Sequence, residues 1–357
     1  MPASQSPTRL PLNLALLYGL AIVYASLQPF AQWMGPLPGV PFFLFAPWPP
    51  RWVRYDVLTN LLAYLPFGFF VGLTPRHRRP VAVLAAAVGI GALLSFTMET
   101  LQTFLPGRDA SMTDFVSNVA GVAVGGVLAV AFSRSPAAWR FVATIRDRWF
   151  LEGAVGDVGL ALLAIWLAVQ ANPGIPLFAT MYDPAQHSPV ATPDFAATIV
   201  EAAHSSFQLL GVGLFLALLL RERRYVGGAV LLLIGAAALI KGIAAALLLR
   251  PAAWEGWLSA PVAMGVAAGS LLLSMAIWLP RPAQVTLAAT ALLSSLLATV
   301  FAPDLLSARA PMGLFNGPYG HLLNFNGLTH TVLLLWPAVA SGALFALAGR
   351  ADWGEPQ

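Results

Sequence analysis

Long apolar segments, separated by short polar ones, follow one another along almost the whole chain. A helix needs about 20 apolar residues to cross the hydrocarbon core of a bilayer. Ten segments approach that length: residues 11–27, 59–73, 81–98, 115–132, 155–170, 205–220, 227–249, 258–279, 285–301 and 328–347. Only 10% of the residues are charged, whereas soluble domains average about 25%. The sequence therefore predicts an all-α, polytopic membrane bundle of about ten transmembrane helices.

The arginines predict how this bundle is oriented. If the N-terminus lies in the cytoplasm and the segments alternate, thirteen arginines fall in cytoplasmic segments and five in external ones. Cytoplasmic loops of membrane proteins carry the excess of positive charge, so both termini are predicted to be cytoplasmic. The net charge of +4 thus reflects topology in a lipid bilayer, and no nucleic-acid partner is expected. The absence of cysteine from the sequence excludes disulfides and thiolate metal sites.

A basic, aromatic segment divides the chain into two predicted parts. Residues 139–150, WRFVATIRDRWF, combine arginines with large aromatic side chains, which is typical of a helix lying in the membrane interface. We predict a four-helix membrane domain over residues 1–133, a cytoplasmic interfacial linker over 134–152, and a six-helix membrane domain over 153–357.

Polar residues are unusually dense between the third and fourth apolar segments, in the stretch SFTMETLQTFLPGRDASMTDFVSN. Glu99 and Gln102 are three residues apart, and Asp114 and Asn118 are four apart. Residues at these spacings share one face of a helix. Under the predicted orientation, both faces lie at the external ends of their helices.

The second apolar segment is predicted to bring a third polar face to the same depth. Asp56 and Asn60 are four residues apart near its external end, and Arg108 lies in the following external turn. Ser111 or Thr113 is the predicted cap of the fourth segment. Ionisable groups inside membrane segments are costly and usually mark function, so we interpret this convergence as an external polar pocket. The alternative is a network that only holds three helices together.

These residues and their spacing resemble the VanZ-like family of bacterial integral membrane proteins. The pattern D-x-x-x-N, P-x-G, E-x-x-Q, G-R-x-x-x-x-x-D and N-x-x-G occurs in order. Its residues here are Asp56, Asn60, Pro66, Gly68, Glu99, Gln102, Gly107, Arg108, Asp114, Asn118 and Gly121. The resemblance covers about residues 10–132, so six predicted helices lie outside it.

The resemblance implies a multi-pass protein of the bacterial inner membrane with a role at the cell envelope, and the founding members are associated with reduced sensitivity to teicoplanin-type antibiotics. A lipid-linked envelope precursor with a phosphate- or glycan-bearing headgroup is the expected ligand. Arg108 would engage an anionic headgroup, with Asp56, Asn60, Gln102 and Asn118 as further ligand-binding residues. Glu99 and Asp114 are the candidates for acid–base catalysis.

Two other functions fit the same sequence. The polar residues can form the outer gate of a transporter or flippase, or belong to a noncatalytic scaffold of envelope assembly. No nucleophile paired with a base is recognisable, so whether the protein is an enzyme stays open, and no cofactor is named by the sequence.

The second half of the chain adds secondary candidates. Lys241 lies within an apolar segment, where it either marks a transport site or extends its ammonium toward the interface. Tyr319, His321 and His330 belong to a polar, aromatic external segment that either lines the outer cavity or forms a plain loop. No H-x-x-x-H or H-E-x-x-H motif occurs, so no metal site is predicted.

Overall fold

In the computed structural model the chain is helical and divides into two compact units, Met1–Arg146 and Asp147–Gln357. The structure describes residues 9–28, 30–35, 39, 41–46, 48, 54–74, 79–106, 108–179, 195–254, 256–301 and 319–349. These residues contain no β-strand; their one antiparallel bridge joins Phe150 to Leu220. The predicted all-α, polytopic fold class is confirmed.

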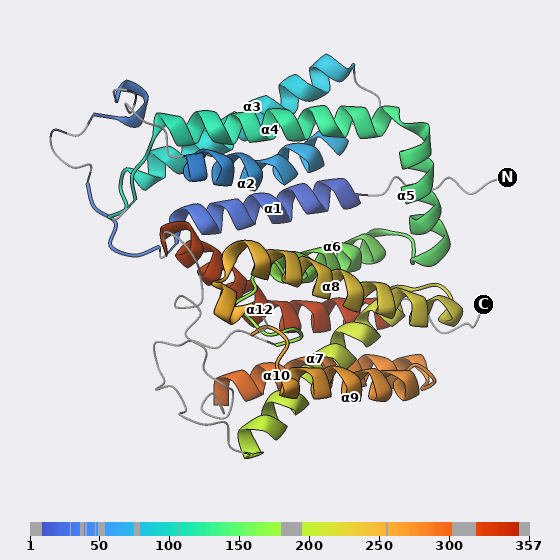
Figure 1. The fold of residues 1–357 in the computed structure, drawn as a ribbon. Helices are drawn as coiled ribbons and strands as arrows, with labels where there is room; N and C mark the ends of the chain where they lie inside the picture. Colours follow the sequence, from blue (N-terminus) through green and yellow to red (C-terminus); the bar gives the residue numbers. More distant parts are fainter. Residues whose placement is uncertain are drawn as a thin grey trace. The chain divides into compact units, whose positions relative to one another are not determined.

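The first unit contains four long apolar helices (Figure 1). They are α1 (Leu10–Leu27), α2 (Arg54–Leu73), α3 (Pro80–Gln102) and α4 (Met112–Arg134). Proline stands in the first turn of α1 and α3, where its missing N–H breaks no helical hydrogen bond. The helix α5 (Pro136–Trp149) follows and buries none of its residues.

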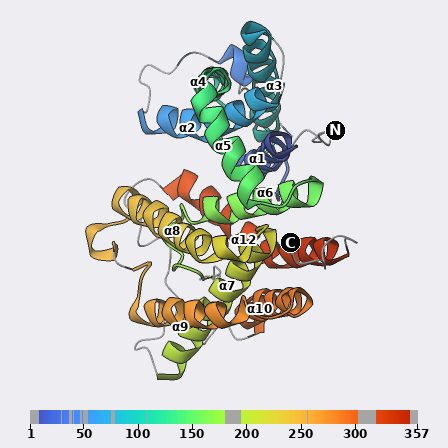
Figure 2. The same cartoon turned by 90° about the vertical axis from the view of Figure 1, so that its right-hand side faces the viewer.

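The helices α2 and α4 approach each other closely because glycine lines their contact (Figures 1 and 2). A Cβ atom on Gly121 would lie 2.3 Å from the Leu61 carbonyl oxygen, and one on Gly125 would lie 2.1 Å from that of Leu65. Positions rise together along the two helices, so α2 and α4 run parallel. Small residues allow such backbone contact between membrane helices, and this contact brings the starts of both helices to the same level.

The apolar core of this unit draws on all four helices. Ile22 of α1, Phe67 of α2, Met98 of α3 and Val122 of α4 are buried in one cluster. The core therefore fixes the register of the four helices at the depth where their polar residues lie.

The described residues of the second unit form six α-helices after α5. They are α6 (Ala154–Val169), α7 (Phe195–Leu219), α8 (Val226–Leu248), α9 (Ala260–Ala276), α10 (Arg281–Phe301) and α12 (Tyr319–Ala348). The start of α9 is capped by the Ser259 hydroxyl, which accepts a hydrogen bond from the Val262 N–H.

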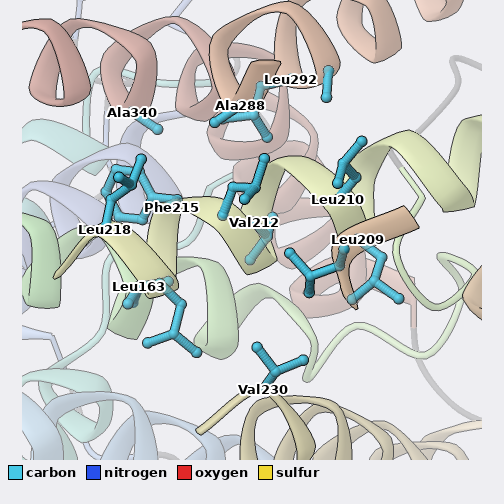
Figure 3. Close-up of a cluster of buried hydrophobic side chains, with 14 of the residues drawn as sticks. Leu163, Leu209, Leu210, Val212, Phe215, Leu218, Val230, Ala288, Leu292 and Ala340 are labelled. Carbon is cyan, nitrogen blue, oxygen red and sulfur yellow. The ribbon is translucent and has the colours of Figure 1, made fainter. Parts of the chain in front are cut away.

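The helix α7 forms the centre of the second unit. In the apolar stretch of α7, 78% of the residues are buried, against 17% in that of α1. Figure 3 shows its side chains Leu209, Val212 and Phe215 among residues from the surrounding helices, including Leu292 of α10. Burial on all sides identifies α7 as the helix around which the others pack.

Over the residues that the structure describes, seven helices are long and apolar enough to cross a membrane: α1, α2, α3, α4, α7, α8 and α12. The helices α6 and α9 are apolar but shorter, with 16 and 17 residues. Each of the ten predicted segments falls on an observed helix. The number of crossings and the orientation stay predictions.

Candidate functional site

Glu99 lies buried near the end of α3, where it is 3% exposed. Its Oε2 atom accepts a hydrogen bond of 2.9 Å from the backbone N–H of Ser111. Ser111 is the residue that caps α4, because its hydroxyl accepts from the Asp114 N–H; of the two predicted caps, Ser111 is the one observed. The Glu99 and Asp114 carboxyl groups are near enough to interact electrostatically. One carboxylate therefore joins the end of α3 to the start of α4.

Asn118 forms a second polar contact between these two helices. Its Nδ2 atom donates a 3.0 Å hydrogen bond to the Ser95 hydroxyl, and both residues are buried. The Asn118 Oδ1 atom is buried and has no hydrogen-bond partner among the described residues. The amide is thus held at one end and unsatisfied at the other.

The helix α2 supplies two more buried polar groups. The Tyr64 side chain, 4% exposed, interacts electrostatically with Glu99, and its hydroxyl lies close to the hydroxyls of Ser95 and Ser26. The Tyr64 hydroxyl nevertheless lacks the geometry of a hydrogen bond to any described residue. One turn away, the Nδ2 atom of Asn60 is buried without a partner in the described part of the chain.

We call Tyr64, Ser95, Glu99, Asp114 and Asn118 the polar cluster. The cluster contains hydroxyl, carboxyl and amide groups from three helices within a membrane-embedded bundle. Thr113, beside Asp114 in the first turn of α4, adds a buried hydroxyl oxygen without a partner among the described residues. Since buried polar atoms are almost always hydrogen-bonded, several unsatisfied ones in one region call for an explanation.

Two predicted ligand-binding residues make contacts of a different kind. Arg108 Nη2 donates hydrogen bonds to the carbonyl oxygens of Ala25 (3.2 Å) and Gln28 (2.6 Å). Gln102 Nε2 donates to that of Ser26, at 3.0 Å. The last carbonyls of a helix have no partner within the helix, and a cation there also opposes the negative end of the helix dipole. Arg108 and Gln102 therefore cap α1.

Burial affects the charge of Arg108 as well as its contacts. The side chain is half-buried in the segment between α3 and α4, and desolvation lowers the pKa of its guanidinium below the usual value. The cost of that desolvation is offset by the carbonyl oxygens it meets, since hydrogen bonds to charged groups are among the stronger ones.

Asp56 lies at the start of α2. It is half-buried in the first turn of α2, where a negative charge is favourable beside the unpaired N–H groups of the helix start. Helix geometry places it one turn from Asn60.

The secondary candidates belong to the second unit. Lys241, 1% exposed, donates from Nζ to the carbonyl oxygens of Asn172 and Ile175, both at 2.9 Å. Asn172 in turn donates to Asn326 Oδ1 and to the Thr329 hydroxyl of α12. Lys241 therefore supports the non-helical segment after α6 by satisfying two of its buried carbonyl oxygens.

The remaining secondary candidates contribute less to this picture. His330 is half-buried on α12. The side chains of Tyr319 and His321 lie outside the described residues, as does Gly107 of the sequence motif. Among the residues that the structure describes, no group of three His, Asp or Glu side chains is placed to hold a metal ion.

Three residues of this region were not predicted as site residues from the sequence. Tyr64 follows Asn60 by four positions and Ser95 precedes Glu99 by four, so each shares a helix face with a predicted residue. Extending the polar faces by one helical turn finds both. Thr113 carries no such signal, because its position favoured a capping role.

Comparison with known proteins bears on the first unit. Residues 2–133 match the family model described as VanZ/LLP1. No curated protein and no solved structure matched the chain. The motif glycines Gly68 and Gly121 of this region stand at the α2–α4 contact, where a Cβ atom would meet backbone of the other helix. From the matched residues, their motifs and this helix arrangement, we conclude that the chain carries a VanZ-like multi-pass membrane region over residues 2–133.

Proposed function

We propose that the VanZ-like region binds the hydroxyl-rich, glycan-bearing headgroup of a lipid-linked envelope precursor in the polar cluster. The observation that carries this proposal is the set of unsatisfied buried atoms. Tyr64, Thr113 and Asn118 are at most 8% exposed, and each has a polar side-chain atom with no partner among the described residues. Leaving such atoms unpaired costs about 1–3 kcal/mol each, and ligand hydroxyls would satisfy them.

The charges of the cluster favour a glycan over a bare phosphate. Glu99 and Asp114 would repel an anion, whereas carboxylates accept hydrogen bonds from sugar hydroxyls. The contacts of Arg108 with α1 support a positioning role: it holds α1 beside the cluster instead of binding a headgroup phosphate. Asp56 and Asn60, at the start of α2, would contact the more distal part of the same headgroup.

The predicted orientation gives this binding its biological setting. With both termini in the cytoplasm, the polar cluster lies at the external side of the bacterial inner membrane, where lipid-linked glycans of the envelope are exposed. Sequestering or presenting such a precursor would suit a glycopeptide-tolerance role of the VanZ type. The proposal includes no chemical step.

The headgroup class is tested with two probes of matched chain length. The full-length protein is purified in polyoxyethylene detergent, and its thermal unfolding is followed while dodecyl maltoside or dodecyl phosphate is added. At ten times its Kd a bound probe stabilises the folded state by about 1.4 kcal/mol. We expect dodecyl maltoside to raise the Tm of the wild-type protein and dodecyl phosphate to have little effect.

Two isosteric variants locate the binding in the polar cluster. Tyr64→Phe and Thr113→Val each remove one unsatisfied oxygen, so both variants should fold. The apparent Kd for dodecyl maltoside should rise by about 5-fold or more in each. The matched control is Thr97→Val, whose exposed hydroxyl donates only to Leu93 of its own helix; it should respond as the wild type does.

Two results would contradict the proposal. Stronger stabilisation by dodecyl phosphate would show that the headgroup class is wrong. An unchanged maltoside response in both Tyr64→Phe and Thr113→Val would show that the probe binds elsewhere.

A further inference from the structure

The helix α5 follows α4 through a sharp corner at one residue. The helix α4 ends at Arg134 and α5 begins at Pro136, so Ser135 alone lies between them. The Ser135 backbone is extended, with φ −89° and ψ 102°, and its hydroxyl accepts a 3.3 Å hydrogen bond from the Ala138 N–H. Ser135 thereby caps the start of α5. Figures 1 and 2 show α5 running across the direction of α4.

Side-chain contacts hold this corner. Phe132 of α4 and Trp139 of α5 meet edge to face, with 6.3 Å between their ring centroids. The Arg140 Nε atom donates a 3.0 Å hydrogen bond to the Pro136 carbonyl oxygen within α5. Because α4 is long and apolar enough to cross a membrane, α5 begins at the level where the chain would leave the bilayer.

The side chains of α5 form two faces. One face is apolar, and its residues, three positions apart, are Trp139, Val142 and Ile145. The other is polar, and its residues, four positions apart, are Arg140, Thr144 and Arg148. At 3.6 residues per turn the centres of the two faces lie roughly 160° apart around the helix. A helix of this kind is typical of the membrane interface, where it lies in the plane of the bilayer.

Large apolar side chains of α5 are exposed. Trp139 is 38% exposed and Val142 is 47% exposed, and Phe141, at the border between the two faces, is 67% exposed. Ile145 is half-buried. Neighbouring exposed apolar side chains mark a surface that binds a membrane or another protein. The membrane is favoured here, because the corner fixes this surface beside the end of an apolar helix.

The exposed charges along α5 and the end of α4 are mainly positive. Arg134, Arg140 and Arg148 are exposed, and Asp147 is the one acidic residue of α5. Arg146 is half-buried and has a partner, so it is not counted. Three exposed arginines against one aspartate leave a net charge of +2, which is complementary to anionic lipid headgroups.

We propose that α5 lies in the plane of the membrane surface and binds anionic phospholipids, with its apolar face among the acyl chains and its arginines at the headgroup phosphates. The planar fork of arginine binds phosphate in a bidentate manner. The predicted orientation places α5 at the cytoplasmic leaflet, whose surface is negative. Beyond the interfacial position that the sequence predicts, the exposed arginines thus give α5 a lipid class. The polar cluster lies at the opposite end of α4, so the two proposals are independent.

The depth of α5 is tested with single cysteine labels, since the chain contains no cysteine of its own. Val142→Cys on the apolar face and Thr144→Cys on the polar face are each labelled with bimane in the full-length protein. The protein is reconstituted into vesicles of equimolar phosphatidylcholine and phosphatidylglycerol. We expect lipids with brominated acyl chains to quench the label at position 142 about 3-fold or more as strongly as the label at position 144, because only the apolar face enters the acyl region.

The lipid class is tested by brominating one lipid at a time. We expect brominated phosphatidylglycerol to quench the label at position 142 about 3-fold or more as strongly as brominated phosphatidylcholine does, because each arginine near the surface attracts anionic lipid. At about 1 M salt, where the screening length is about 3 Å, this preference should be lost. The salt dependence is measured on the labelled protein with all its arginines, so it does not rely on the folding of arginine variants.

Arginine variants separate α5 from general surface charge. Arg140→Gln should lower the preference for phosphatidylglycerol, and Arg140→Gln with Arg148→Gln should bring the quenching ratio of the two lipids close to one. The matched control is Arg79→Gln, which removes one exposed arginine at the start of α3. It should keep the ratio of the unsubstituted protein.

Four results would overturn the assignment. Equal quenching at positions 142 and 144 would show that α5 does not lie in the surface with its apolar face inward. Weak quenching by both lipids at position 142, with the label also shielded from aqueous iodide, would show that a second protein chain covers this face. Equal quenching by the two lipids would show that the lipid class is wrong. An equal loss in Arg79→Gln and Arg140→Gln would assign the preference to the overall charge of the protein.

Discussion

Arg108 shows how a residue of the VanZ-like motif can serve a helix instead of a ligand. Its guanidinium donates to the carbonyl oxygens of Ala25 and Gln28 at the end of α1, which lie 83 and 80 positions earlier in the chain. Gln102 reinforces the same helix end. The motif thus contains residues that position α1 as well as residues that surround the polar cluster.

Removing the Arg108 guanidinium should detach the end of α1. We expect Arg108→Gln to lower the free energy of unfolding by about 1.5–3 kcal/mol, the usual worth of hydrogen bonds to a charged group. The free energy of unfolding of Arg108→Lys should lie between those of the wild type and Arg108→Gln, because lysine keeps the charge but lacks the planar fork of the guanidinium. Chemical denaturation in detergent measures the effect. Arg134→Gln, an exposed change in the last turn of α4, is the control; a similar loss in that variant would refute the capping role.

At the scale of helices, the α2–α4 contact decides where the polar residues meet. Both helices start at the same end of the unit and run parallel with their backbones touching at glycines. This contact brings Tyr64 of α2 close to Ser95 and Glu99 of α3, to which Asn118 of α4 is also joined through Ser95. A shift of one helix along the other would separate the members of the polar cluster.

A methyl group at the α2–α4 contact should therefore damage both stability and binding. Gly125→Ala would place Cβ 2.1 Å from the Leu65 carbonyl oxygen, and overpacking of this kind costs about 1–3 kcal/mol. In Gly89→Ala of α3, the new Cβ meets nothing within 4 Å, so stability should be unchanged or higher by up to about 1 kcal/mol. Thermal unfolding and the dodecyl maltoside response compare the two. Equal behaviour of both variants would be inconsistent with this contact as the organising element.

At the scale of the whole molecule, the predicted number of membrane crossings combines the helices of both units. In the described part of the chain, seven helices have the length and hydropathy of a span, while α6 and α9 have 16 and 17 residues. At 1.5 Å per residue these two reach about 24–26 Å, short of the roughly 30 Å hydrocarbon core. Local thinning of the bilayer accommodates spans of this length at modest cost. With α10, a helix of 21 residues that the sequence also predicts to cross, ten crossings remain the prediction.

Reporter fusions test this topology in cells. With ten crossings and a cytoplasmic N-terminus, a fluorescent protein fused after residue 357 should fold and fluoresce, as should one inserted near Arg223. A periplasmic phosphatase inserted within residues 180–194 or 302–318 should be active. Seven crossings would instead place the C-terminus outside, so an inactive C-terminal fluorescent fusion with an active phosphatase fusion at the same point would rule out ten.

The sequence by itself determined the membrane class, the helix positions and the VanZ-like motif. Hydropathy and helical spacing are local properties, so Glu99 with Gln102, and Asp114 with Asn118, could be assigned to shared helix faces without knowledge of their neighbours. The same spacing rule also places Tyr64 and Ser95 on these helix faces, because each lies one turn from a predicted residue.

Only the tertiary structure decided what each polar side chain meets. The rotation of each helix about its axis and its register against the next fix those contacts, and both depend on packing between distant segments. Packing directs Arg108 and Gln102 to the end of α1, and Lys241 to the carbonyls of the segment after α6. It also leaves Trp139 and Val142 of α5 exposed, because the burial of a side chain depends on neighbours that no local spacing encodes.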